Sequence, residues 1–250
     1  MFRPLSYYFN LQNIKMIALL TSISRKIWGN KDYQYIFFAI ASFITIFLLG
    51  YYFGTFDQAS HIPYLKKYAD PSLFPNDKFF DIRYFHYSFF WFFYIPFYRM
   101  GILEIAMFIT HFLATFLTFW AIWHLAKTLF KNPIASFLAV VAFIFPHVGF
   151  AGFPIFEFSL LNRTFVFPFL LIAINLYLNK KPISAFLILG LMYNIHVVSV
   201  NFIIAMFLFD SLLRIKEIGI KNIIGRLMVL LIFASPVLIW KFSNSHVAVG

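Results

Sequence analysis

The chain has 250 residues, of which 62% are hydrophobic and only 12% are charged, and its mean hydropathy is +0.82. Soluble domains carry about 25% charged residues, so this composition indicates an integral membrane protein and an all-α bundle of membrane-spanning helices. The chain has no cysteine, which excludes disulfides, thiolate nucleophiles and cysteine zinc sites. Its net charge of +11 comes from basic residues at the ends of apolar segments, a pattern that indicates membrane topology and predicts no nucleic-acid partner.

The first 34 residues are predicted to form a cytoplasmic amphipathic segment. The stretch "KMIALLTSIS" is a short apolar run without a small-x-small cleavage site, and Arg25 and Lys26 follow it, so a secretory signal is not expected. We expect this segment to lie on the bilayer, with Lys15, Arg25 and Lys26 facing phospholipid headgroups.

Residues 35–250 are predicted to form the transmembrane domain, with about seven spans. A hydrocarbon core about 30 Å thick needs about 20 apolar residues per helix, and several of the candidates are shorter than this. The predicted spans are Tyr35–Phe53, Ile102–Ala126, Ile134–Phe150, Phe165–Leu178, Ile183–His196, Val197–Leu213 and Ile223–Trp240.

Basic residues predict the orientation of these spans. With a cytoplasmic N-terminus, 13 of the 20 lysines and arginines fall on the inner side, as the positive-inside rule requires. We therefore expect a multi-pass protein of the cell membrane with its N-terminus in the cytoplasm.

A large first outer loop, residues 54–100, follows the first span. Its final part, "YFHYSFFWFFYIPFYR" (Tyr84–Arg99), is aromatic at 11 of 16 positions, and a crossing there would place every later basic cluster outside. We expect it to form a helix in the outer interface, which aromatic rings favour, and we expect Pro96 to end that helix.

Asp57 is the leading catalytic candidate in this loop. It lies just past the first span, where partial desolvation raises the basicity of a carboxylate that can still meet a water-soluble acceptor. If "DQASHIPYLKKY" is helical, Asp57 and His61 share a face. The alternative is that Asp57 caps this helix. Asp70, Asp77 and Asp81, which lie in turn sequences, are interpreted as solvated turn residues.

Three further residues are candidates for substrate binding, each with a structural alternative. Arg163 in "LLNRTFVFPF" can hold a phosphate bidentately at the lipid boundary or act as a snorkelling anchor. Lys66 can assist in phosphate binding or lie on a solvated face. His196 falls where two short spans meet, and it can line a cavity or pair with a neighbouring polar group.

A divalent cation is a weaker possibility for the same region. Asp57, His61 and Glu157 carry suitable ligand atoms, but the loop has no D-x-D pattern and nothing in the sequence fixes their geometry. The sequence therefore predicts no cofactor with certainty.

Three stretches of the chain carry a family resemblance. They are "YYFGTFDQASHIPYLKKYADPSLFPNDKF", with an acid just beyond the first span; "THFLATFLTFWAIWHLAKTLFKNPIASFLAVVAFIFP", two spans with a basic inner turn; and "LNRTFVFPFLLIAINLYLNKKPISAFLILGLMYNIH". Over residues 35–240 the chain resembles the GT-C superfamily of polytopic glycosyltransferases, which includes protein mannosyltransferases and aminoarabinose transferases.

The resemblance implies transfer of a sugar from a polyprenyl-phosphate donor to an acceptor on the outer face. Asp57 would take the role of the first-loop acid, as catalytic base or organiser of the acceptor. Arg163 and His196 would bind the donor phosphate, with His61 and Lys66 as further substrate-binding residues. Many members have a paired acid or a D-x-D in this loop, whereas here Phe56 and Gln58 flank Asp57.

Two alternatives stay open at the level of the sequence. The first is a non-enzymatic multi-pass protein, such as a scaffold, a lipid-binding protein or a transporter subunit, although ion-coupled transport is disfavoured because charges lie at span ends. The second concerns completeness: members of the family continue into further spans, so the chain is either a fragment or a minimal module.

Overall fold

The computed structural model describes residues 5–80, 87–148 and 154–244. Within these ranges the chain is mostly helical and contains no strand, which confirms the expected all-α class. The helices are α1 (Leu5–Gly29), α2 (Lys31–Leu49), α3 (Gln58–Ala69), the 3₁₀ helix η2 (Trp91–Tyr94), α4 (Ile95–Arg99), α5 (Leu103–Phe130), α6 (Pro133–Ile144), α7 (Asn162–Leu178), α8 (Pro182–Tyr193), α9 (Val197–Leu213), α10 (Ile215–Ile218) and α11 (Ile220–Asn244).

Three helices in the described ranges, α2, α5 and α11, are long and apolar enough to cross a membrane. The other four predicted spans contain the shorter apolar helices α6, α7, α8 and α9, which have 12 to 17 residues. At 1.5 Å per residue these helices extend about 18 to 26 Å, less than the ~30 Å of a hydrocarbon core. The prediction of about seven full spans is therefore not confirmed.

Local sequence explains why two of the predicted spans stop early. α6 ends at Ile144 because Pro146 disfavours a helical conformation at Phe145, which is extended (φ −79°, ψ 151°). The carbonyl of Ile144 accepts a bond from the Thr45 hydroxyl of α2 (3.2 Å). α8 ends at Tyr193, and α9 begins only after His196, so the fifth and sixth predicted spans meet at a break, as expected.

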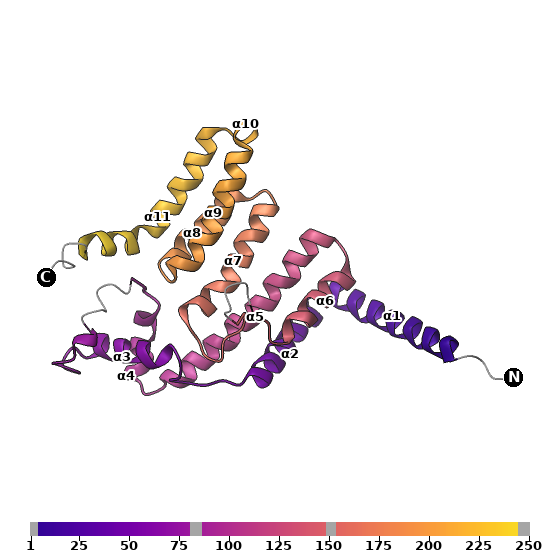
Figure 1. Ribbon diagram of the computed structural model, residues 1–250, viewed down its shortest axis with the longest axis horizontal. Helices are drawn as coiled ribbons and strands as arrows, with labels where there is room; N and C mark the ends of the chain where they lie inside the picture. The colour runs from indigo at the N-terminus through magenta and orange to yellow at the C-terminus, as the bar shows by residue number, and fades with distance from the viewer. Residues whose placement is uncertain (1–4, 81–86, 149–153, 245–250) are drawn as a thin grey trace.

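Most of the N-terminal segment forms a single long helix. α1 covers 25 residues and ends at Gly29. The side chain of the next residue, Asn30, accepts bonds from the backbone N–H groups of Asp32 and Tyr33 and so caps α2. Figure 1 shows the N-terminal part of α1 projecting from the bundle. Ile27, near its other end, is buried against α2 and α5.

The aromatic segment is not one interfacial helix. Residues 81–86 lie outside the described ranges, and the rest forms the short helices η2 and α4. Pro96 lies in the first turn of α4 instead of ending a helix. A proline is tolerated there because the N–H groups of the first turn have no partner within the helix. Trp91 and Tyr94 are buried against α3 and α5, so the segment packs onto the bundle.

The helices form a bundle with two ends that carry different polar groups. α5 packs against α2, α6 and α7, and α8 packs against α7 and α11. Figure 1 shows α3 and α4 at one end and α10 at the other, which we call the α3 end and the α10 end. At Gly190, α8 approaches α11 so closely that a Cβ would lie 2.7 Å from the Leu230 carbonyl oxygen.

Replacing Gly190 with alanine is therefore expected to destabilise the protein. The Cβ would meet backbone, which cannot move aside as a side chain can, so we expect a loss of about 1–3 kcal/mol in thermal unfolding of detergent-solubilised protein. Gly225→Ala is the matched control, because nothing lies within 4 Å of its Cβ position. We expect it to be neutral or to stabilise α11 by up to about 1 kcal/mol. Equal effects of the two substitutions would contradict the close approach of α8 and α11.

Candidate functional site

Two segments far apart in sequence are joined at the α3 end. The backbone N–H of Tyr52 donates to the Phe158 carbonyl (2.8 Å). Gln58 is fully buried, and its side-chain amide donates to the Leu160 carbonyl (2.7 Å) and accepts from the Gly54 N–H (2.8 Å). These bonds fix the start of α3 against the segment that leads into α7.

Asp57 lies at this junction and pairs with Arg163. An oxygen of Asp57 is 2.9 Å from the Arg163 Nη1, and an oxygen of Glu157 is 2.7 Å from the Arg163 Nε. The Asp57 side chain is 49% exposed, whereas that of Glu157 is only 11% exposed. We call these three residues the acid–arginine cluster.

The charge of Arg163 is stabilised by both carboxylates. Partial burial lowers the pKa of its guanidinium, but the bonds with Glu157 and then Asp57 outweigh this effect and raise the pKa above its ordinary value. One arginine therefore keeps two carboxylates close together that would otherwise repel each other.

The capping interpretation of Asp57 does not hold for its side chain. Asp57 occupies the position before α3, as that interpretation expected, but its backbone is already helical (φ −61°, ψ −27°) and its side chain makes no cap bond. The side chain turns to Arg163 instead. Asp70 and Asp77 do behave as turn residues: their carboxylates accept bonds from the backbone N–H groups of Ser72 and Phe79 (both 2.9 Å).

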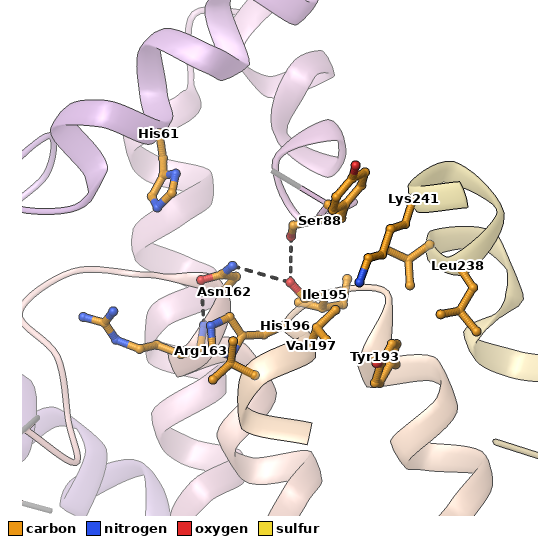
Figure 2. A pocket seen from close by; sticks show the side chains of 13 residues that line it. His61, Ser88, Asn162, Arg163, Tyr193, Ile195, His196, Val197, Leu238 and Lys241 are labelled. Atoms are coloured by element: carbon orange, nitrogen blue, oxygen red, sulfur yellow. Dashed lines mark hydrogen bonds between the residues drawn. The ribbon is translucent and has the colours of Figure 1, made fainter. Parts of the chain in front are cut away.

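A cavity of about 330 Å³ lies beside the cluster (Figure 2). Segments from α3, the region before η2, the start of α7, the α8–α9 break and the end of α11 enclose it. Its walls are His61, Tyr87, Ser88, Asn162, Arg163, Tyr193, Ile195, His196, Val197, Val198, Val237, Leu238 and Lys241.

Three of the predicted substrate-binding residues meet at this cavity. His61 reaches it from α3, with its ring stacked on Trp91 at a centroid distance of 4.9 Å. His196 also caps α9, because its Nδ1 lies 2.7 Å from the Ser199 hydroxyl and 3.3 Å from the Ser199 backbone N. His196 also lies on the cavity wall, so it has both of the roles considered for it, pairing with a polar group and lining a cavity. Arg163 is the third of these residues on the wall.

Lys66 is not brought to this cavity. Its ammonium lies 6.0 Å from the centre of the Tyr98 ring, and it is not among the residues of the cavity wall. Lys241 of α11 supplies a cation there instead, and Figure 2 shows it reaching towards the centre of the cavity while the Arg163 guanidinium points away from Lys241.

The possible metal ligands do not converge. Within the described part of the chain, no group of three or more histidine, aspartate or glutamate side chains is arranged to hold a metal ion. Asp57 and Glu157 are bridged by Arg163, while His61 stacks on Trp91.

Lys241 reaches the cavity because α11 is kinked. Pro236 lacks an N–H and interrupts the helix, and Figure 1 shows α11 turning near its C-terminal end. Asn194 repairs the opening: its Oδ1 accepts from the Val237 N–H (3.0 Å) and its Nδ2 donates to the Phe233 carbonyl (2.7 Å), two groups that pair in an unbroken helix. Pro236 is a signal in the sequence for a bend in α11. The residue that bonds the opened backbone, Asn194, is distant from it in the chain.

Replacing Asn194 with alanine is expected to destabilise the kink. The Val237 N–H and the Phe233 carbonyl would lose their partner in a partly buried place, which costs about 1–3 kcal/mol for each unsatisfied group. Asn222→Ala is the control, because the Asn222 amide also bonds a carbonyl but is exposed, so water replaces it. Thermal unfolding of the two variants measures the difference, and equal shifts would argue against a bridging role for Asn194.

The site thus combines an arginine, a lysine and two histidines on the cavity wall with a carboxylate, Asp57, that is not a wall residue itself but pairs with the wall residue Arg163. Such a set can orient a hydroxyl group at the carboxylate and bind an anion at the cationic wall. The chain matches no protein-family model, no curated protein and no solved structure.

Proposed function

We propose that the chain is an integral membrane glycosyltransferase of the GT-C type, which transfers a sugar from a polyprenyl-phosphate donor to an acceptor on the outer face of the cell membrane. The observation that carries this proposal is the acid–arginine cluster at the edge of a cavity whose wall carries Lys241 and His196. A transferase of this kind needs a base, a cationic site for the phosphate and an apolar path for the lipid.

Exposed apolar side chains support the membrane setting. Phe47 of α2 is 78% exposed and Phe202 of α9 is 72% exposed, and large apolar residues are exposed on α5 and α11 as well. Water disfavours apolar surface of this extent, and lipid tails accommodate it. In the proposed topology the α10 end, rich in basic residues, faces the cytoplasm together with the N-terminus, and the α3 end faces outward.

In the proposed reaction, an acceptor hydroxyl attacks the anomeric carbon of the donor sugar. The new bond joins the acceptor oxygen to that carbon, and the bond from the carbon to the phosphate oxygen breaks, with inversion. Asp57 orients the hydroxyl and accepts its proton, and the phosphate leaves on its polyprenyl chain. Because the phosphate is a good leaving group, little acid catalysis is required.

Lys241 and His196 are proposed to stabilise the phosphate as it leaves. Lys241 reaches into the cavity, whereas the Arg163 guanidinium is already engaged by two carboxylates. The role first expected of Arg163, phosphate binding, thus passes to Lys241, and Arg163 becomes a positioning residue for Asp57. Lys66 has no part in this mechanism, because it lies away from the cavity wall.

Replacing Asp57 with asparagine tests the proposal. Asparagine keeps the shape but cannot accept the proton, so we expect transfer from a polyprenyl-phosphate sugar to fall about 100-fold or more, the usual contribution of a general base. Asp77→Asn is the matched control, because Asp77 lies in the same loop and its carboxylate accepts the Phe79 N–H of a turn, so we expect unchanged transfer. The assay follows labelled sugar in proteoliposomes.

Two outcomes would contradict the proposed function. If wild type and Asp57→Asn transfer sugar equally, the catalytic role of Asp57 is wrong. If neither transfers any polyprenyl-linked sugar offered, a non-enzymatic role as a scaffold or lipid-binding protein becomes the better interpretation.

A further inference from the structure

A second cavity, at the α10 end, is lined by cations that the proposed reaction does not use. It has a volume of about 170 Å³ and lies where α7, α8, α10 and α11 meet. Its walls are Tyr177, Lys180, Pro182, Arg214, Ile218 and Arg226.

The positive charge of this cavity is only partly compensated. Among the described residues, Asp210 is the acid that pairs with a wall residue: its Oδ1 lies 3.1 Å from the Arg214 Nε. The Tyr177 hydroxyl also donates to Asp210, at 2.6 Å. The Asp210 carboxylate also interacts electrostatically with Arg226, so this one acid faces the three cations of the wall and positive charge remains in excess there.

Two of the wall cations follow the ends of helices in the chain, and the third, Arg226, reaches the cavity from another helix. Arg214 directly follows the end of α9, and Lys180 lies two residues after the end of α7, where a positive charge complements the helix dipole. Arg226 lies in the second turn of α11 and is half-buried, with its Nη1 3.2 Å from the hydroxyl of Ser211, which belongs to the last turn of α9. A half-buried guanidinium turned into a cavity is suited to binding an oxyanion.

Exposed apolar residues lie next to wall residues of this cavity in the chain. Leu213, just before Arg214, is 71% exposed, and Ile220 at the start of α11 is 55% exposed. A second recess, which includes Leu178 and Asn179 beside Lys180, is also lined by the basic residues Lys127 and Lys131 and by His124. A ligand with an anionic phosphate and an apolar tail matches this combination better than a small polar ion does.

We propose that this cavity binds the phosphate group of an anionic phospholipid, with Arg226 and Lys180 contacting the phosphate oxygens and the acyl chains lying against the exposed side chains near Leu213 and Ile220. This site is at the opposite end of the bundle from the acid–arginine cluster, and it does not depend on the proposed transferase activity. Basic recesses between membrane helices are suited to such headgroups.

The test uses the full chain, purified and delipidated in a neutral detergent. Binding of short-chain phosphatidylglycerol is measured by native mass spectrometry for the wild type, Arg226→Gln, Lys180→Gln and Lys221→Gln. We expect Arg226→Gln to weaken binding about tenfold, or about 1.4 kcal/mol, and Lys180→Gln to weaken it in the same direction. Lys221→Gln is the matched control, because it removes the same charge from the same end of α11 outside the cavity wall, and it should bind like the wild type.

Phosphatidylcholine and inorganic phosphate are the two comparison ligands. We expect phosphatidylcholine to bind more weakly than phosphatidylglycerol and inorganic phosphate to compete only weakly. If inorganic phosphate binds as tightly, with the same loss in Arg226→Gln, the phosphate site stands and the lipid tail has no part in it. If Lys221→Gln loses as much as Arg226→Gln, or if neither Arg226→Gln nor Lys180→Gln changes binding, the proposed site is wrong.

An unliganded melting temperature keeps folding separate from binding. Arg226 contacts Ser211, so Arg226→Gln can lower stability by itself, whereas the Lys180 side chain is exposed. Loss of lipid binding in Lys180→Gln at an unchanged melting temperature would support the site even if Arg226→Gln folds poorly. If Arg226→Gln folds poorly and a well-folded Lys180→Gln binds phosphatidylglycerol like the wild type, the proposed site with two cations is wrong.

Discussion

The bond between Arg163 and two carboxylates is the interaction on which the α3 end depends. Asp57 belongs to the segment before α3, Glu157 to the segment before α7, and Arg163 to α7 itself. Without a cation between them, the carboxylates would repel each other, and this repulsion would disfavour the contact between the two segments. The buried Gln58 adds neutral bonds at the same junction, so charge and hydrogen bonding hold Asp57 in one place.

The cavity beside Asp57 is built from parts that are each shaped by a local break in helical structure. α8 stops at Tyr193, α9 starts after His196, and α11 bends at Pro236. Asn194 links the first break to the last by bonding both sides of the α11 bend. In lipid, backbone groups opened by a kink need a protein partner, so this amide makes a polar cavity possible within an apolar bundle.

The sequence was sufficient to predict the helical class and the place where α8 and α9 meet, and it offered His61, Arg163 and His196 as separate candidates. Composition and hydropathy predict helices and their ends because these depend mainly on residues that are neighbours in the chain. The early end of α6 was accessible as well, because Pro146 is a local signal that disfavours helix at Phe145. The pairing of Asp57 with Arg163 and the entry of Lys241 were beyond the sequence, because each depends on tertiary contacts between residues far apart in the chain. Lys66 failed as a candidate for the same reason, since proximity to Asp57 in sequence did not bring it to the cavity.

Whether Arg163 holds Asp57 beside the cavity is tested most directly by a double-mutant cycle of Asp57→Asn and Arg163→Gln, read out as free energies of unfolding. Since the Asp57 side chain is 49% exposed, solvent screens the pair, and we predict a coupling of about 0.5–1 kcal/mol that falls as salt is added. Additive effects of the two substitutions, with no dependence on salt, would contradict the pairing and with it the placement of the carboxylate at the cavity.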